Sequence, residues 1–316
     1  METVHVPVMA EEVLELLSPG PGKVYVDCTL GGGGHASAVW KSIQPDGVLL
    51  GIDRDPKAVG RAKTRLDGIA PGAKFACGRF GDLPSILQEF GIFAVDGIVA
   101  DLGFSRDQLE DGERGFSFLR EGPLDMRMDP HREGPTAADL VNGLSEAELA
   151  RLFRDYGEEE FAKRIARVLA AERGRAPVAT TARLAELVSS AVPAKARRRI
   201  HPATQVFQSL RIAVNDEMGE LSRFLGSFFD FLAPSGVCAV ISFHSLEDRM
   251  VKTRFRELTT SCVCPKDMPC ICGGKAPAEL LTRKAKRPSE REVADNPLSR
   301  SARLRAIRKA AERRPS

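Results

Sequence analysis

The sequence predicts an α/β protein whose doubly wound sheet is interrupted by an all-helical domain. Over residues 1–100, short β-branched runs alternate with amphipathic segments, a pattern typical of a parallel sheet covered by helices. From 105 to 205 the helical periodicity continues without a convincing strand, and an apolar strand returns at 237–243. We therefore expect one sheet domain formed by residues 1–104 and 206–316, with a helical domain at 105–205 inserted into it.

The elements of the sheet domain follow from their apolar patterns. The first expected strands are 23–27, 48–53, 74–77 and 95–101. One helix is expected before them at about 8–17, and three between them at about 35–43, 56–66 and 83–90. In the second half, a helix at about 205–232 ends before Gly236, and strands are expected at 237–243, 280–286 and 301–307. The chain contains no internal repeat.

Two patterns support helices in the inserted block. Ser145 and Glu148 have the spacing of a capping box, in which hydroxyl and carboxylate satisfy the free N–H groups of a first turn. A following segment has an apolar stripe opposite a basic one. The stripe consists of Phe161, Ile165, Val168 and Leu169, and the basic residues are Lys163, Arg164 and Arg167.

Four consecutive glycines, Gly31 to Gly34, join the first strand to the helix near His35. Glycine permits a sharp turn and a close approach of ligand to backbone. Between a strand and a helix, such a loop offers N–H groups to a nucleotide-like molecule. The next strand ends in Asp53, which is placed to accept hydrogen bonds from two ribose hydroxyls. This order favours a nucleoside cofactor, either a dinucleotide or S-adenosylmethionine (SAM).

Acids also end the first and fourth expected strands. Asp27 ends the first, where methyltransferases commonly have an acid that organises the loop near the methionine amino group. Asp101 ends the fourth, at the sheet edge where an open α/β sheet binds the reactive part of its ligand. The glycines do not match the dinucleotide pattern Gly-x-Gly-x-x-Gly well, because they are contiguous and position 36 is Ala.

The composition is that of an ordinary globular protein, with 43% hydrophobic and 28% charged residues. We see no secretory signal and no apolar run near the roughly 20 residues that span a bilayer, so we expect a cytoplasmic protein with no membrane partner. The net charge is +3, but residues 283–316 have 12 Lys or Arg against 4 Asp or Glu, so this segment carries +8 and the rest −5. A basic segment suits RNA, although a solvated helix can have the same composition.

Eight blocks along the chain together resemble a known enzyme family. They are Gly33-Gly34-His35, Ile52–Asp55, Asp101–Gly103, Glu113–Phe118, Pro123–Asp129, His201–Thr204, Ser242–Arg249 and Asn296-Pro297. From about Val4 to Arg308 the sequence is similar to the bacterial small-subunit ribosomal RNA cytosine-N4 methyltransferases, the MraW/RsmH family. The resemblance implies SAM as methyl donor, a Rossmann-like catalytic domain with a helical insert, and a decoding-region cytosine of 16S ribosomal RNA as target. The small ribosomal subunit is then the partner, and a homodimer is one assembly that the sequence allows.

The resemblance also implies roles for individual residues. By position, Gly33, Gly34 and His35 would contact the methionine part of SAM, Asp53 the ribose, and Phe80 the adenine. Asp101 and Gln108 would complete the pocket near the methyl donor, with Asp101 as the catalytic residue. Taken singly, His35 also suits a helix cap, Phe80 a core position and Gln108 an ordinary loop.

Other residues near the expected site have two interpretations. Phe104 has the acid-to-aromatic spacing of amino-methyltransferases, but this chain lacks their prolines and departs from the family pattern at Phe104-Ser105-Arg106, so we do not expect Phe104 to be a required base-stacking residue. His244, Glu247 and Asp248 follow a strand, and they either contact RNA or form a helix N-cap with a paired histidine. Lys195 to Arg199, the helical insert and the basic C-terminal segment are expected to bind RNA phosphates.

Four of the seven cysteines are clustered as two Cys-x-Cys pairs. Cys262, Cys264, Cys270 and Cys272 favour a thiolate metal site over disulfides in a cytosolic protein, and four sulfurs suit structural zinc. Their spacing is not the usual Cys-x-x-Cys. Cys28, Cys77 and Cys238 lie in apolar strands and are expected to be buried packing residues.

Two rival functions use the same cofactor loop. An NAD-dependent oxidoreductase would suit the glycines and Asp53, but it requires an acid/base site for hydride transfer, and the insert has no convincing one. A non-catalytic ribosome-assembly factor with a relic cofactor fold would be expected to have an eroded glycine loop or to lack Asp101, and this chain retains both.

Overall fold

The structure is a computed structural model, and it describes residues 7–70, 72–131, 133–194, 201–261, 274 and 276–311. The chain forms two compact units. The first consists of residues 1–103 and 219–316, and the second of residues 104–218. The second unit thus begins beside the expected position but extends to Met218, beyond the boundary expected after residue 205.

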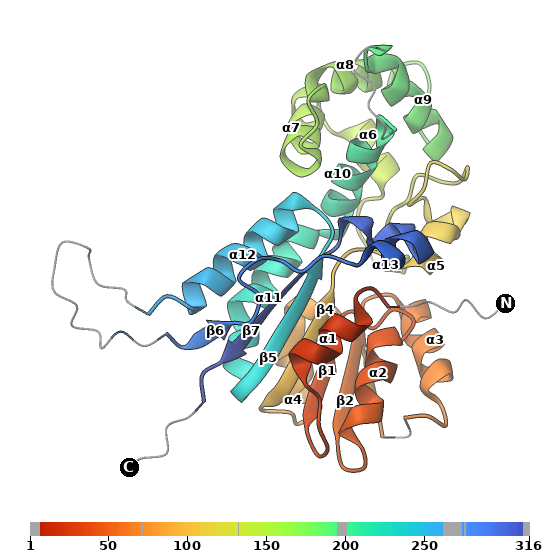
Figure 1. Ribbon diagram of the computed structural model, residues 1–316. Helices are drawn as coiled ribbons and strands as arrows, with labels where there is room; N and C mark the ends of the chain where they lie inside the picture. The colour runs from red at the N-terminus through yellow and green to blue at the C-terminus, as the bar shows by residue number, and fades with distance from the viewer. Residues whose placement is uncertain are drawn as a thin grey trace. The chain divides into compact units, whose positions relative to one another are not determined.

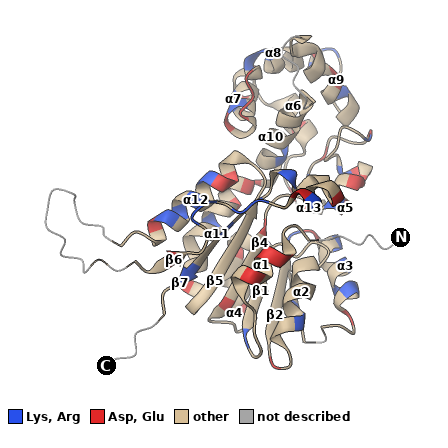
Figure 2. Cartoon of the chain, viewed as in Figure 1, with Lys and Arg blue, Asp and Glu red and all other residues tan. Residues whose placement is uncertain are grey.

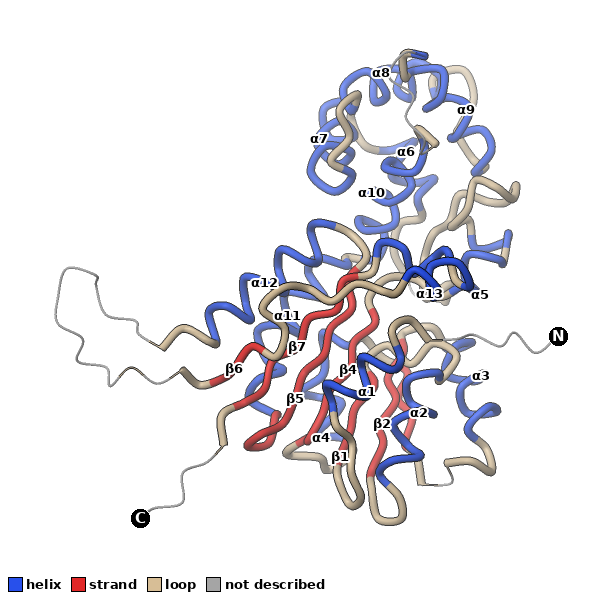
Figure 3. Tube along the Cα trace, in the orientation of Figure 1, coloured by secondary structure: helices blue, strands red, loops and turns tan. Residues whose placement is uncertain are grey.

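The first unit is built on a seven-stranded sheet with the strand order β3-β2-β1-β4-β5-β7-β6 (Figures 1 and 3). The strands are β1 Val24–Asp27, β2 Val48–Asp53, β3 Lys74–Cys77, β4 Val95–Asp101, β5 Leu232–Ser242, β6 Ala278–Leu280 and β7 Arg303–Lys309. Strands β1 to β5 pair in parallel, whereas β7 is antiparallel to both β5 and β6. The sheet is therefore mixed and Rossmann-like, and its strand order reverses between β1 and β4, the place where such sheets bind ligands.

Helices cover both faces of this sheet because strand side chains alternate between two cores. Tyr25 and Leu49 belong to the core under α1, α2 and α3, and Val26 and Leu50 to the core under α4, α11 and α12. The helices are α1 Ala10–Leu17, α2 Gly34–Ile43, α3 Pro56–Leu66, α4 Leu83–Glu89, α11 Glu217–Phe231, α12 Ser245–Leu258 and α13 Glu290–Asp295, with 3-10 turns at Phe80–Asp82 and Pro297–Ser301.

The second unit is helical, as expected. Its helices are α5 Arg106–Glu110, α6 Ala137–Gly143, α7 Glu146–Gly157, α8 Ala162–Arg173, α9 Thr181–Ala191 and α10 Ala203–Asn215, with a 3-10 turn at Gly112–Arg114. The capping box predicted at Ser145 is confirmed, since the Ser145 N–H donates to Glu148 and the Glu148 N–H donates to the Ser145 hydroxyl. Ile165 and Leu169 of the predicted stripe are fully buried in its core.

The helix expected at 205–232 is wrong as a single helix. It is divided into α10 and α11 at Asp216, whose backbone is left-handed with a φ of 52°. The break lies in the polar run Asn215-Asp216-Glu217, and the helical pattern resumes directly after it.

The strand expected at 280–286 is also wrong in extent. Only β6 pairs regularly with β7, followed by one isolated bridge between Lys286 and Leu304. The ladder ends because the hydroxyl of Thr282, rather than a backbone carbonyl, accepts the N–H of Ala306 at 2.9 Å. Across the described parts of the chain, no helix combines the length and apolar character needed to cross a membrane.

Candidate active site

The loop between β1 and α2 has the left-handed backbone that its glycines permit. Gly31 has a φ of 50° and Gly33 a φ of 75°, values that residues with side chains rarely adopt. Gly33 is the N-cap of α2, so the loop leads directly into a helix N-terminus. The loop is anchored because the Gly31 N–H donates to Asp53 Oδ2 at 2.7 Å. The glycines thus form the turn that the sequence predicted.

The aspartates that end β1, β2 and β4 meet at one edge of the sheet because these strands are parallel and in register. Asp53 also accepts the Asp55 N–H at 2.9 Å, and Asp27 Oδ1 accepts the Thr29 N–H at 3.1 Å. Burial raises the pKa of Asp27 to about 6, against the opposing effects of His35 and the Thr29 N–H. Burial likewise raises the pKa of Asp53. Carboxyl groups are therefore concentrated at the edge where the glycine loop lies.

His35, in the first turn of α2, faces Asp101 at the end of β4. Its Nε2 lies 3.6 Å from Asp101 Oδ2, an electrostatic contact longer than a hydrogen bond. Burial favours the neutral imidazole, but the carboxylates of Asp101 and Asp27 outweigh this effect, and the pKa of His35 is raised. The hydroxyl of Thr29 accepts the backbone N–H of Asp101 at 2.6 Å and ties β4 to the glycine loop.

Three buried atoms of this cluster have no hydrogen-bond partner among the described residues. They are Asp27 Oδ2, His35 Nε2 and Asp101 Oδ1. A buried polar atom without a partner is costly, and native proteins contain few of them. Two carboxylate oxygens and an imidazole nitrogen beside a glycine turn are suited to a polar ligand that carries N–H groups. We interpret this cluster as a ligand-binding site.

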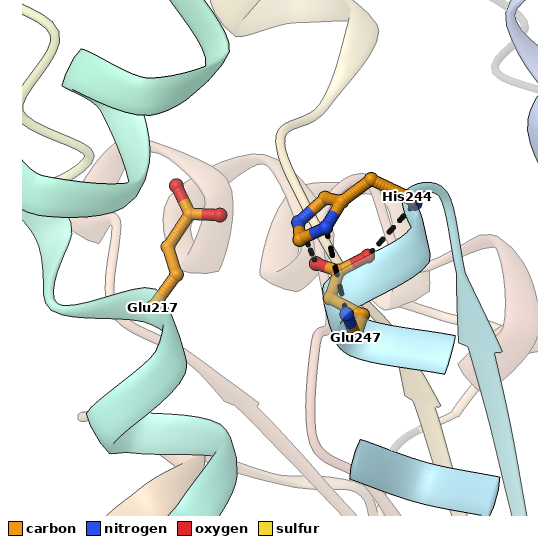
Figure 4. A group of neighbouring side chains, drawn as sticks. All are labelled: Glu217, His244 and Glu247. Carbon is orange, nitrogen blue, oxygen red and sulfur yellow. Dashed lines mark hydrogen bonds and ion pairs between the residues drawn. The ribbon is translucent and has the colours of Figure 1, made fainter. Parts of the chain in front are cut away.

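His244 and Glu247 form the N-cap of α12, the second of the two interpretations that the sequence left open (Figure 4). Glu247 Oε2 accepts the backbone N–H of Phe243 at 2.9 Å, and Glu247 Oε1 lies 3.2 Å from His244 Nε2. Asp248 instead binds two arginines of β7, Arg303 and Arg305. These side chains organise the helix that follows β5.

The comparison with protein families decides what this site belongs to. Residues 2–310 match the model of the MraW methylase family. The chain belongs to the MraW methylase family. It is 51% identical over 308 residues to the ribosomal RNA small subunit methyltransferase H of Anaeromyxobacter sp. (strain K), covering 96% of this chain and 97% of that protein. It is 50% identical to the protein of the same name from Geobacter sulfurreducens over 307 residues, 96% of this chain and 98% of the relative.

Membership of the MraW methylase family makes this chain an enzyme with SAM as its methyl donor, and the unpartnered atoms suit that molecule. The methionine part of SAM has an ammonium group, and Asp27 Oδ2 is a buried acceptor without a partner among the described residues. Its carboxylate suits the N–H groups of a glycine turn at a helix N-terminus. Asp53, at the end of β2, remains beside the loop with one further lone pair on each oxygen for a ribose.

The two remaining predicted cofactor residues of this MraW methylase, Phe80 and Gln108, make contacts within their own units. Phe80 opens a 3-10 turn after β3 and contacts Phe224 edge to face, with ring centroids 5.6 Å apart. Phe80 is half-buried, so it also packs against the core, as its alternative interpretation suggested. Gln108 lies in the second unit, where it is buried and its Oε1 accepts the Ser105 N–H at 2.9 Å.

Phe104 is held by its own unit of the methylase. Its ring stacks on Phe116 at 5.9 Å and lies under the Arg211 guanidinium, 4.9 Å from the centroid. Both contacts involve the ring, and whether Phe104 stacks on the base stays a prediction. Arg211 in turn forms a two-point ion pair with Glu217 at 2.8 Å.

Several predicted residues of the methylase lie outside the described part of the chain. These are the four cysteines expected to bind zinc (Cys262, Cys264, Cys270 and Cys272) and the arginines Arg197, Arg198 and Arg199. Of the other cysteines, Cys28 and Cys238 are buried as expected, but Cys77 is exposed because it ends the edge strand β3.

Two residues near the site were not predicted from the sequence. One is Thr29, whose hydroxyl holds the end of β4. The other is Glu292 of α13, which accepts the backbone N–H of Met9 at 2.7 Å and so fixes the segment before α1. Burial raises the pKa of Glu292, and the charges of Glu12 and Asp101 act in the same direction. No local pattern marks Glu292, because its partner is 283 residues away in the chain.

Proposed function

We propose that this methylase transfers a methyl group from SAM to the exocyclic N4 amine of a decoding-region cytosine in 16S ribosomal RNA. The observation that carries the proposal is the buried Asp101 Oδ1, which has no partner among the described residues and lies beside the glycine loop. The substrate is inferred from the relatives named ribosomal RNA small subunit methyltransferase H. A cytoplasmic location is part of the same proposal.

Each cofactor residue has a proposed role. Gly33, Gly34 and His35 hold the methionine part, Asp53 holds the ribose, and Phe80 lies against the adenine, and Gln108 is a further proposed cofactor residue. When bound, SAM supplies a methyl group on a positively charged sulfur. The protein itself has to bind the amine in the correct orientation and accept a proton.

Asp101 is the residue proposed to do both. The lone pair of cytosine N4 is delocalised into the ring, so the amine is a poor nucleophile and depends on positioning, which can supply several kcal/mol. Asp101 Oδ1 is free to accept an N–H of the amine and to take the proton that the amine sheds as it forms its new N–C bond. His35, whose pKa is raised, lies 3.6 Å from Asp101 Oδ2 and helps to orient this carboxyl group. The target base must leave its stack to reach this site.

The test is methyl transfer by the purified protein from SAM to small-subunit RNA, both protein-free and in assembled subunits. We expect a single N4-methylcytidine, identified by nuclease mapping, mass spectrometry and chromatography against 5-methylcytidine. Asp101→Asn, which keeps the shape of the side chain, should lower turnover by about 100-fold or more with SAM affinity retained. Methylation of carbon 5 or of another nucleotide would overturn the proposed target, and normal turnover of Asp101→Asn would overturn the role of Asp101.

Structural zinc is a separate proposal that rests on the spacing of the cysteine cluster 262–272 alone. If the four thiolates close a tetrahedral site, protein purified without chelator should contain about one zinc per chain. Elemental analysis that finds no metal, in protein that is folded and binds SAM, would contradict it.

A further inference from the structure

We propose that the outer face of helix α12 holds the phosphate backbone of the RNA substrate through Arg249, Lys252 and Arg256, which we call the α12 stripe. This inference rests on the proposed function, because it needs an RNA substrate, but it concerns a surface outside the cofactor site. None of its residues belongs to the glycine loop or to the aspartate cluster.

The packing of α12 turns the stripe toward solvent. Val251, Phe255 and Leu258 lie on the inner side of the helix and are buried in the core that it shares with α4 and α11. Arg249, Lys252 and Arg256 recur at helical spacing on the opposite side, and all three are exposed. Along the helix axis they are separated by rises of about 4.5 and 6 Å, so their charges form a continuous row.

The acidic residues of α12 do not neutralise Lys252 and Arg256, because each of these acids has another partner. Glu247 caps the helix with His244, and Glu257 binds Arg254. Asp248 is shared by two arginines of β7, Arg305 at 2.7 Å and Arg303 at 3.0 Å, which leaves positive charge at the start of the helix. Neither Lys252 nor Arg256 forms an ion pair within the part of the chain that the structure describes.

The stripe begins beside the candidate active site. Strand β5 pairs with β4 so that Ile241 lies opposite Asp101, and the Leu102 N–H donates to the Ile241 carbonyl at 3.0 Å. Helix α12 starts at Ser245, just after β5 ends, so the register of β4 and β5 puts its first turn at the same sheet edge as Asp101. Basic residues follow along this helix (Figure 2). A strand of RNA with its target base at Asp101 could therefore continue along α12.

The part of the chain that contains α12 is also more basic than the helical block. Residues 245–258 and 276–311 contain 14 Lys or Arg and 7 Asp or Glu, a net charge of +7. The block 105–205 contains 17 basic and 17 acidic residues, and many of its exposed arginines are paired, such as Arg154 with Asp155 and Arg175 with Glu172. RNA binding depends on cations that are available to replace its counterions. Thus Lys252 and Arg256 of α12 are cations available to RNA, a kind of residue that the helical block largely lacks.

The test neutralises the stripe with Arg249→Gln, Lys252→Gln and Arg256→Gln together. Binding of protein-free small-subunit RNA, titrated at several salt concentrations, should weaken about tenfold or more at physiological salt. The slope of log affinity against log salt should fall by about 2, since each contact to a single strand contributes about 0.7. SAM affinity should stay unchanged, because the cofactor residues are intact.

A matched control removes three positive charges from the same unit. Lys41, Lys63 and Lys74 are exposed near the amino-terminal edge of the parallel strands, opposite the aspartate cluster. Changing these three to Gln should leave RNA affinity and salt slope close to wild type. Equal weakening in both variants, or wild-type RNA binding by the α12 variant, would overturn the proposal. If the wild type methylates small-subunit RNA in the same experiment, that failure concerns α12 alone; if it does not, the proposed function itself fails.

Discussion

Asp53 combines a structural role with its proposed role in cofactor binding. It accepts N–H groups from Gly31 and Asp55, so it holds the glycine loop in place before any ligand arrives. If it also binds both ribose hydroxyls, Asp53→Ala should weaken SAM binding by about 2–3 kcal/mol, the scale of lost hydrogen bonds to a charged group. Titration calorimetry measures the loss, and a melting curve shows whether the variant is folded. Unchanged SAM affinity in a folded variant would remove Asp53 from the ribose site.

Asp27 should make the stability of the protein depend on pH in an unusual direction. Its pKa is about 6 in the folded protein against an ordinary 3.8, because the ionised carboxylate is buried. Well below pH 3.8 the group is neutral in both states and has no effect. Between about pH 4 and 6 the carboxyl group ionises in the unfolded chain while the folded protein still holds the proton, so stability falls by about 2–3 kcal/mol for a shift of about two units, and above pH 6 this loss is constant.

Asp27→Asn should therefore raise the free energy of unfolding at pH 8 and leave it nearly unchanged below pH 4. Asparagine retains an acceptor for the Thr29 N–H, so the local hydrogen bond is preserved. Urea unfolding at the two pH values measures both differences. The same difference at both pH values would show that the buried charge is not the cause.

Individual residues could be predicted where the pattern is local in the sequence. They could not be predicted where two partners are far apart along the chain. The glycine turn and the three strand-ending aspartates are local patterns, and the structure contains them as expected. The bond between Thr29 and Asp101 joins residues 72 apart, and the bond between Glu292 and Met9 residues 283 apart. Such pairs depend on the order of strands in the sheet, which periodicity does not specify.

At the scale of elements, Asp248 should be the main polar connection between α12 and β7. Its side chain and that of Arg305 are only 10% and 11% exposed, and Arg303 completes the cluster. Asp248→Asn leaves two guanidinium groups together without a counter-charge. We expect the free energy of unfolding to fall by about 2–4 kcal/mol at neutral pH, somewhat below the cost of breaking a fully buried pair.

Glu257→Gln is the matched control on the same helix. Glu257 pairs with Arg254 but is 58% exposed, so its loss should cost less than about 1 kcal/mol. The two arginines lower the pKa of Asp248, against the effect of burial, so its stabilising effect should disappear only as the pH falls below its ordinary 3.8. Similar losses in both variants, measured by urea unfolding, would argue against a special role for the cluster.

The positions of elements were predictable where a single local signal dominates. Strands β1 to β4 are short apolar runs, and they lie where the sequence placed them. Strand β5 begins earlier than expected, at Leu232, because the chain pairs with β4 through an irregular stretch that includes Ser235 in a left-handed conformation. In contrast, the end of β6 depends on the Thr282 hydroxyl, which accepts the N–H of Ala306 from 24 residues further along the chain, and no local pattern marks this contact.

For the molecule as a whole, the charge of the helical block depends on one short segment. Lys195, Arg197, Arg198 and Arg199 are 4 of its 17 basic residues, and without them the block would carry −4. If this segment contacts RNA, changing the three arginines to Gln should weaken RNA binding and reduce the salt slope by about 2, with SAM affinity unchanged. Superimposable titrations of wild type and variant would remove the segment from the substrate path.

The place of β7 in the sheet has a consequence for how the protein is made. This strand, Arg303–Lys309, comes from the end of the chain yet lies between β5 and β6. A growing chain that has completed β4 must wait for roughly 200 further residues before β7 can be added, which takes about 10–40 s at usual rates of translation. During that time the nascent chain has an open sheet edge that can pair with other chains. A premature stop shortly before residue 303 would make this condition permanent, because the edge of β5 would then never be covered by β7.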